Sequence, residues 1–239
     1  MKRILLFRGP EQACSYLPDR VSRSAFVDTR LQLDVPTYSS LAAQGFRRSG
    51  DLVYQPNCPA CSACVPVRIP VARFSPNRSQ WRTLRKNADL TITPKPAEFD
   101  AEHYQLFLRY LAARHDEGGM KDSSPQDYIG FLGSAWADTA FVEFRLHEEL
   151  LAVAVVDRLV SGLSAVYTFF DPAHEERGLG TLAVLWQIEE AKRLGLDWLY
   201  LGFWIGACGK MSYKTNFRPL EALINDHWLS VEKGEKIDI

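Results

Sequence analysis

The spacing of apolar residues predicts two helices near the middle of the chain. The first has the i, i+3, i+4, i+7 pattern of a helix that buries one face, and it runs from a cap at Asp100 to about Arg114. Its apolar positions are Tyr104, Phe107, Leu108 and Leu111. The second begins at Ser124, where a capping residue is followed by a proline and then by Asp127, and it runs to about Leu132.

Apolar stretches joined by short turns predict an antiparallel sheet after these helices. The strands are expected at 139–146, 150–160 and 163–170, and two- or three-residue turns join them into a meander. A glycine turn at 177–180 then leads into a helix through Arg193, which Gly195 closes. Further strands are expected at 197–204 and within 220–232.

The first part of the chain is less regular. Residues 28–36 alternate and predict a strand that ends at Pro36, followed by a short helix capped by Thr37 or Ser39 and a strand to Tyr54. A helix is expected over 79–87. The prolines of 91–99 favour a linker, so we expect a region 1–90 and a second domain 91–239.

The order of these elements resembles the GNAT acyltransferases. The predicted fold class is therefore α+β: a GNAT-like domain with a mainly antiparallel sheet, plus a smaller region rich in Cys, Pro and Arg. The resemblance implies that the turn at 175–180 offers backbone N–H groups to the phosphates of an acyl carrier. Glu175 stands where that family has Gln or Arg, and its charge would repel the pyrophosphate of coenzyme A.

Charge is divided unevenly between the two regions. Residues 1–89 hold 14 Lys and Arg against 6 Asp and Glu, a net charge of +8, whereas residues 90–239 hold 14 against 23, a net charge of −9. Such asymmetry favours a polyanionic partner, although the two regions could also pack through complementary faces. No apolar run is long enough to span a membrane, and the N-terminus lacks the cleavage pattern of a signal peptide, so we expect a cytoplasmic protein.

Three of the five cysteines, Cys58, Cys61 and Cys64, stand three residues apart. In a cytosolic protein this spacing favours a metal over a disulfide framework. A fourth ligand must come from elsewhere, and Cys14 is the candidate. Zinc and an iron–sulfur cluster both fit four thiolates, and we expect a structural role for either. The alternative is a thiol-rich turn that packs without metal.

Cations follow the cysteines directly. The segment from Arg68 to Lys86 has six cations and no acid, with aromatic Phe74 and Trp81 between them. Guanidinium groups match phosphate oxygens in a forked geometry, and aromatic rings stack on bases, so nucleic acid is the expected partner. The alternative is a solvated helix face with ion pairs to the acidic region. The cations concerned are Arg68, Arg73, Arg78, Arg82, Arg85 and Lys86.

Two later segments also carry candidate chemistry. In residues 206–221 four polar side chains would share one helix face and could bind an anion, namely Lys210, Tyr213, Lys214 and Arg218. Tyr167 and Asp171 stand at the end of a predicted strand, where a site could open. A solvated helix face and a set of core aromatics are the alternatives. The five histidines form no metal-binding pattern.

Taken together, these segments resemble the bacterial aminoacyl-tRNA–protein transferases, the family of the aspartate/glutamate leucyltransferases and a relative of the eukaryotic arginyl-tRNA–protein transferases. The matching motifs run from Cys14 to about Glu221: CSYLP, YxPxCxxCxxCxPxR, FxPxxxQxR, HxxGGM, YTFFDP and YLGFWIxxCxKMxYKxxFRP. Asn77 is a small departure, since serine is common there.

The resemblance implies an enzyme that moves leucine from Leu-tRNA to the N-terminal amine of proteins that begin with Asp or Glu and so marks them for degradation. The ester is already activated, so the chemistry requires no cofactor. Lys214 or Arg73 would pair with the acceptor carboxylate, and Lys210 or Arg218 would meet the terminal phosphates of the tRNA. Arg78 and Arg82 of the basic segment are further candidates for binding this substrate. Tyr167 or Tyr213 would polarise the ester carbonyl, and Asp171 is a candidate base.

Three other functions remain open from the sequence. Arginine could replace leucine as the donor amino acid, because only the family resemblance favours leucine. A GNAT small-molecule N-acetyltransferase would bind acetyl-coenzyme A. A non-catalytic module that binds zinc and RNA would show salt-sensitive RNA affinity without acyl transfer.

Overall fold

The computed structural model describes residues 4–114 and 123–237 and is built on one eight-stranded sheet. Its strand order is β14-β13-β7-β12-β11-β10-β9-β8, and neighbouring strands are antiparallel except for the parallel pair of β11 and β12. The strands are β7 (Val65–Pro70), β8 (Thr91–Pro96), β9 (Asp138–Leu146), β10 (Glu149–Arg158), β11 (Gly162–Phe170), β12 (Trp198–Trp204), β13 (Leu220–Ile224) and β14 (His227–Val231).

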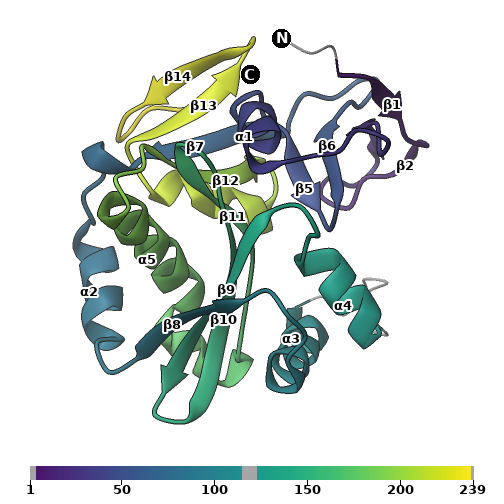
Figure 1. Ribbon diagram of the computed structural model, residues 1–239. Coiled ribbons are helices and arrows are strands. Elements are labelled where there is room, and N and C mark those ends of the chain that lie inside the picture. Colours follow the sequence, from purple (N-terminus) through teal and green to yellow (C-terminus); the bar gives the residue numbers. More distant parts are fainter. Residues whose placement is uncertain (1–3, 115–122, 238–239) are drawn as a thin grey trace.

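Helices cover both faces of this sheet (Figure 1). On one face lie α2 (Arg78–Lys86) and α5 (Leu179–Arg193), and on the other lie α3 (Ala101–Arg114) and α4 (Pro125–Leu132). Side chains alternate along a strand, so β10 sends Ala152 and Ala154 into the α5 core and Val153 into the α3–α4 core. Burial on both faces explains why β10 is almost continuously apolar.

The N-terminal residues form a smaller layer of two sheets and one helix. A four-stranded sheet has the order β1-β4-β6-β5, and β2 pairs with β3. Val27, Tyr38 and Val53 of this layer share a core with Leu159 and Tyr200 of the large sheet. The elements are β1 (Leu6–Arg8), β2 (Gln12–Ala13), β3 (Val21–Ser22), β4 (Ser24–Val27), α1 (Val35–Ala43), β5 (Arg47–Ser49) and β6 (Leu52–Pro56).

The central helices and the meander are confirmed, and three other predictions are wrong. Residues 28–36 form no strand, because Asp34 caps α1 by accepting the N–H of Thr37 at 2.8 Å, and Pro36 fits the first helical turn. Residues 91–99 are not a linker, since β8 occupies the edge of the sheet, where prolines are tolerated. The segment 206–221 forms only the short α6 (Gly209–Ser212) and η3 (Tyr213–Asn216).

The large sheet crosses the boundary that the sequence analysis drew after residue 90. Strand β7 lies between β13 and β12 in the interior of the sheet, although it precedes that boundary. The remaining short helices are η1 (Val71–Arg73) and η2 (Pro172–Arg177). In the described part of the chain, no helix has both the length and the apolar character that crossing a membrane requires.

A buried ion pair joins the N-terminal layer to the large sheet. The Arg48 guanidinium on β5 binds both carboxylate oxygens of Asp157 on β10, at 2.6 and 2.7 Å, and both side chains are fully buried. The same guanidinium donates to the carbonyls of Leu132 and Gly133 at the end of α4, each at 3.0 Å. One arginine therefore connects β5, β10 and α4, and each of its partners is desolvated.

Replacing Asp157 with Asn should destabilise the protein strongly, because it leaves a buried guanidinium without its counter-charge. We expect the free energy of unfolding in urea to fall by about 3–5 kcal/mol. A matched control is Glu190→Gln, which breaks the α5 surface pair with Arg193 and should cost less than about 0.5 kcal/mol. Equal losses in the two variants would contradict the role assigned to the buried pair.

Candidate functional site

The parallel strands β11 and β12 separate soon after they begin. Their pairing covers only Gly162–Ser164 against Trp198–Tyr200, whereas both strands continue beyond it. Strand β12 also changes register against β7 between Tyr200 and Gly202, and Gly202 has a φ of +77°. The two strands thus part at a backbone irregularity, and the side chains around this point form the candidate site.

Arg47 occupies the point where these strands part. It is the residue before Arg48 on β5, and it donates from Nη1 to the Ser164 hydroxyl at 3.0 Å and from Nη2 to the carbonyl of Ala165. Its guanidinium lies directly over Gly202, where a Cβ atom would approach Nε to 3.1 Å. Gly202 is therefore required both by its positive φ and by the space that Arg47 fills.

Lys214 is the most unusual charged residue of the site. Its side chain comes from η3 and is 4% exposed, and its Nζ contacts the Met211 sulfur at 3.4 Å and lies 5.0 Å from the centre of the Tyr213 ring. Burial and the charge of Arg47 lower the pKa of this amine to about 7, against smaller opposing effects of Cys208 and Cys64. No carboxylate of the described residues forms an ion pair with it, although buried charges are normally paired.

Two tyrosines complete this group. Tyr167 on β11 packs edge-on against Phe131 and Tyr110, with ring centres at 5.3 and 6.3 Å. Burial raises its pKa, and so do the neighbouring phenols of Tyr110 and Tyr16, so it remains a hydrogen-bond donor at neutral pH. Tyr213 is 42% exposed and also has a raised pKa. Of the predicted residues, Lys214 and Tyr213 are therefore in contact, and Tyr167 packs against Tyr110, whose phenol also raises the pKa of Tyr213.

Asp171 has both carboxylate oxygens engaged. One oxygen caps η2 by accepting the N–H of Ala173 at 2.9 Å, and the other accepts from Arg109 at 3.1 Å. Both oxygens of Asp171 therefore serve internal contacts, one with a helix cap and one with a guanidinium. The base assigned to Asp171 in the sequence analysis stays a prediction, and the geometry favours a structural role.

The five thiols lie in one region. Burial raises the pKa of Cys64 to about 12, and Cys58, Cys14, Cys61 and Cys208 each add to the shift. Cys208 lies far from the other four cysteines in the sequence, and the fold brings it near enough to Cys64 to affect its pKa. Within residues 4–114 and 123–237, no group of three or more Cys, His, Asp or Glu side chains has a geometry that could hold a metal ion. The four-cysteine metal site stays a prediction.

The cations predicted to bind substrate lie in different settings. Arg73 pairs with Glu232, and Arg218 donates to the carbonyls of Val231 and Glu232 at 3.1 and 2.8 Å, so both hold the C-terminal hairpin. Lys210 is exposed and donates to the carbonyl of Arg114 at 3.3 Å. Arg68, from the same basic segment, binds Glu221 at 2.8 Å and stacks on two tryptophans.

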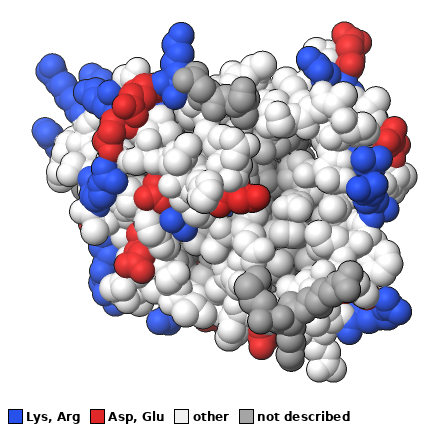
Figure 2. Space-filling view, turned by 90° about the horizontal axis from the view of Figure 1, so that it is seen from above, with Lys and Arg blue, Asp and Glu red and all other residues white. Residues whose placement is uncertain are grey.

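A second group of cations is free of such partners. Arg78, Arg82 and Arg85 are exposed on α2, and no acid of the described residues pairs with them. Trp81 lies beside them with 49% of its surface exposed. Figure 2 shows Lys and Arg gathered along the side of the molecule on which Figure 1 places α2. At the start of α2, Gln80 donates to the carbonyl of Asn216 at 3.0 Å, which joins this helix to the segment of Lys214.

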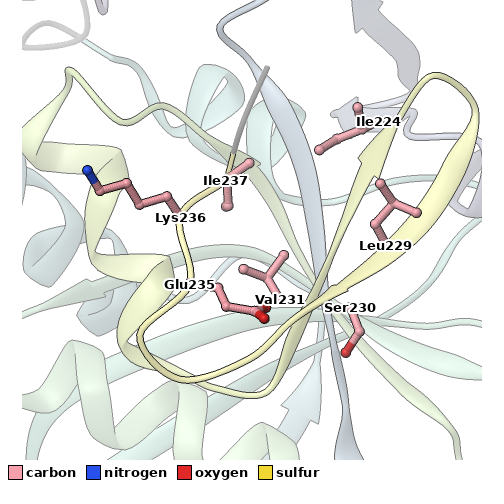
Figure 3. Close-up of a pocket in the computed structure, with 7 residues that line it drawn as sticks. All are labelled: Ile224, Leu229, Ser230, Val231, Glu235, Lys236 and Ile237. Carbon is pink, nitrogen blue, oxygen red and sulfur yellow. The ribbon is translucent and has the colours of Figure 1, made fainter.

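A pocket of about 400 Å³ lies beside the C-terminal hairpin (Figure 3). It is formed by β13, β14 and the segment that follows them, and Ile224, Leu229 and Ile237 line it. None of the predicted site residues lines it. The HxxGGM motif at 115–120 lies outside the described residues.

The sequence analysis missed Arg47, and only a weak signal marked it. Arg47-Arg48 is one of two Arg-Arg or Arg-Lys pairs in the basic region, and nothing local distinguishes it from a solvated pair. Its role depends on contacts with Ser164 and Ala165, which lie 117 and 118 positions later in the chain.

Comparison with known proteins identifies the family of the chain. A family model described as the C terminus of arginine-tRNA-protein transferase matches residues 102–224, and one described as the N terminus matches residues 12–82. Curated aspartate/glutamate leucyltransferases are similar to this chain over nearly their whole length. The enzyme of Nitrosococcus oceani is 53% identical, and the match covers 93% of this chain and 94% of the relative. The enzyme of Hahella chejuensis is 46% identical, and the match covers 97% of this chain and 99% of the relative.

These matches define an aminoacyl-tRNA–protein transferase. The chain belongs to the arginine-tRNA-protein transferase family, and within it resembles the aspartate/glutamate leucyltransferases.

Among solved structures the similarity is weaker. A DUF2156 domain from Agrobacterium fabrum has a TM-score of 0.45 and 12% identity, and covers 71% of this chain and 51% of that one. L-PGS from Bacillus licheniformis has a TM-score of 0.46 and 12% identity, with coverages of 59% and 45%. Scores at this level do not establish a shared fold.

Replacing Lys214 with Met should stabilise the protein near neutral pH. Between pH 7 and the ordinary value of 10.5, lysine takes up a proton on unfolding, so the stability of the wild type rises with pH in this window. Below pH 7 the amine is charged in both states, and the full burial penalty, at most about 5 kcal/mol, is present. Urea unfolding should therefore show a gain for Lys214→Met at about pH 6.5 that shrinks by about pH 9.5.

The control for this measurement is Lys95→Met, at an exposed position on β8, which should show no such trend. A Lys214→Met protein that is less stable than the wild type at about pH 6.5 would contradict the burial of an unpaired amine.

Proposed function

We propose that the chain transfers leucine from Leu-tRNA to the N-terminal amine of proteins that begin with Asp or Glu. The observation that carries this proposal is the buried amine of Lys214, which has no acid partner among the described residues and lies 5.0 Å from the centre of the Tyr213 ring. A desolvated cation without a counter-ion is suited to receive an anionic side chain. The names of the similar leucyltransferases agree with an acidic acceptor.

The reaction needs alignment more than activation. The neutral amine nitrogen of the acceptor attacks the ester carbon, the bond from that carbon to the tRNA ribose oxygen breaks, and the proton lost by the amine is balanced by the one that the ribose oxygen gains. Tyr167 stays protonated because its pKa is raised, so it can donate to the carbonyl oxygen as negative charge develops there. Tyr213 is the second candidate donor.

The exposed cations of α2 would bind the tRNA. Arg78, Arg82 and Arg85 are available for phosphates, and Trp81 for stacking on a base. The contact of Gln80 with Asn216 connects this surface to the segment of Lys214. A tRNA bound on α2 would therefore direct its aminoacylated end towards the site. Since aminoacyl-tRNA is the donor, we place the reaction in the cytoplasm.

The GNAT-like character of the main domain also belongs to this proposal. The parting of β11 and β12, followed by the N-terminus of α5, is the feature that supports it. Glu175, which argued against coenzyme A, is exposed and pairs with Arg114 at 3.2 Å. The tRNA would take the place that an acyl carrier has in the acetyltransferases.

A structural zinc ion or iron–sulfur cluster would be held by Cys14, Cys58, Cys61 and Cys64. The gathering of the thiols around Cys64 supports this, whereas the geometry of the described side chains is not yet that of a metal site. Such a group would stiffen the segment between β6 and β7 and supply no step of the transfer.

The wild-type protein should leucylate a peptide that begins with Asp far faster than its Asn analogue, since only the carboxylate can pair with Lys214. In Lys214→Met, we expect transfer to the Asp peptide to fall at least about 100-fold while Leu-tRNA binding is retained. The assay measures labelled leucine on the peptide and includes Arg-tRNA and acetyl-coenzyme A as competing donors. Transfer of arginine in place of leucine, or unchanged turnover in Lys214→Met, would contradict the proposal.

Removing the charges of α2 should weaken tRNA binding for every acceptor. For the double variant Arg82→Gln, Arg85→Gln, the slope of log affinity against log salt should fall by about 2, one for each lost phosphate contact. The control is Arg193→Gln, an exposed arginine at the end of α5 that pairs with Glu190. Equal salt slopes in the double variant and the wild type would remove α2 from the tRNA surface.

A further inference from the structure

Arg47 and Lys214 form a pair of cations at the point where β11 and β12 part. They come from distant parts of the chain and from two elements that both meet β12. Arg47 on β5 lies against Gly202 of β12, and η3, which carries Lys214, also contacts β12. The charge of Arg47 also disfavours the protonated amine of Lys214. Neither forms an ion pair with a carboxylate of the described residues, although most other arginines of the interior do so. Lys214 is buried and Arg47 is half-buried. Two such cations, with no acid of the described residues paired to either, destabilise the protein unless an anion joins them.

The donors of both groups are only partly used. A guanidinium has five N–H donors, and the described contacts of Arg47 use one on Nη1 and one on Nη2. The ammonium group of Lys214 has three donors, and its described hydrogen bond goes to the Met211 sulfur, which is a weak acceptor. The contacts of Arg47 with Ser164 and Ala165 fix its plane, so its remaining donors are pre-organised.

We propose that Arg47 and Lys214 together bind the side-chain carboxylate of the acceptor, and that Arg47 is the specificity-determining residue that distinguishes Asp and Glu from their amides. This assignment rests on the proposed function, which it extends from one cation to two. Arg47 takes the place that the sequence analysis gave to Arg73, whose guanidinium pairs with Glu232 on the C-terminal hairpin. Gly202 is a positioning residue, because its missing side chain lets the guanidinium lie against β12.

A carboxylate fits this place better than a phosphate of the tRNA. Lys214 is 4% exposed, so its ligand must end there, whereas a phosphodiester continues in two directions. In an N-terminal aspartate, the carboxylate carbon is only two bonds from the Cα that bears the reacting amine. Binding the carboxylate at Arg47 and Lys214 would therefore hold the acceptor amine beside Tyr167 and Tyr213.

The decisive experiment compares Asp- and Asn-starting peptides with wild type, Arg47→Gln and Arg47→Lys. In Arg47→Gln, kcat/KM for the Asp peptide should fall about 100-fold, and that for the Asn peptide should change by less than about threefold. Arg47→Lys keeps a charge but cannot reach Ser164 and Ala165 with a rigid fork, so we expect a loss of about tenfold for the Asp peptide alone. Gly202→Ala should lose the same selectivity by displacing the guanidinium.

Arg193→Gln serves as the matched control and should leave both peptides unchanged. Thermal unfolding of each variant shows whether it is folded, and the conservative Arg47→Lys keeps the test available should Arg47→Gln fail to fold. Equal losses for the Asp and Asn peptides would overturn the assignment. A raised KM for Leu-tRNA with unchanged peptide selectivity would also overturn it, because that result indicates a phosphate contact.

A binding measurement without tRNA separates this inference from the proposed function. Titration calorimetry with short Asp- and Asn-starting peptides should show a preference for Asp in the wild type that Arg47→Gln abolishes. Arg47-dependent binding without any transfer of leucine would refute the proposed function and leave the carboxylate site standing. Transfer of leucine together with an Asp preference that survives Arg47→Gln would refute the carboxylate site alone.

Discussion

The buried pair of Arg48 and Asp157 is the constraint on which the rest of the arrangement depends. It fixes β5 against β10 and the end of α4 through hydrogen bonds that are all desolvated. Neighbouring residues of a strand point to opposite sides, so the fixation of Arg48 also determines where Arg47 points. The same dipeptide therefore attaches the N-terminal layer and presents a cation where β11 and β12 part. An ion pair of this kind adds little net stability, and its value here lies in orientation.

The chemistry of the site follows from the cations that no acid of the described residues pairs with. Lys214 and Arg47 are cations without acids, whereas Asp171, Arg68 and Arg73 are all engaged in internal contacts. The pKa values of Tyr167 and Tyr213 are raised, so both phenols keep their protons, and the described residues of the site offer cations and hydrogen-bond donors. An aminoacyl ester suits such a site, because it needs a well-placed amine and a stabilised oxyanion.

Local signals were sufficient for the helices and the meander. Caps at Asp34, Asp100 and Ser124 and the alternation along β9 to β11 depend on residues close in sequence, and where a cap was misjudged the error was a few residues. The placement of β7, the edge strand β8 and the partners of each arginine depend on contacts across the whole chain. Lys214 could be identified as a candidate from its motif, but its burial could not be predicted from the sequence. Arg47 could not be distinguished from a surface residue without knowledge of the sheet around it.

The interior position of β7 has a consequence for how the chain reaches its native state. This strand hydrogen-bonds to β12 and β13, whose residues lie more than a hundred positions later, so β7 has neither sheet partner until the chain has been synthesised to β12, and lacks the second until β13. Pairings of such sequence separation form slowly, and their exposed edges must be kept from other chains in the meantime. The segments matched by the two family models are therefore not exchangeable modules, because β7 lies in the first segment and its partners β12 and β13 lie in the second. In a hybrid of two relatives, the β7 of one protein must pair with the β12 and β13 of the other.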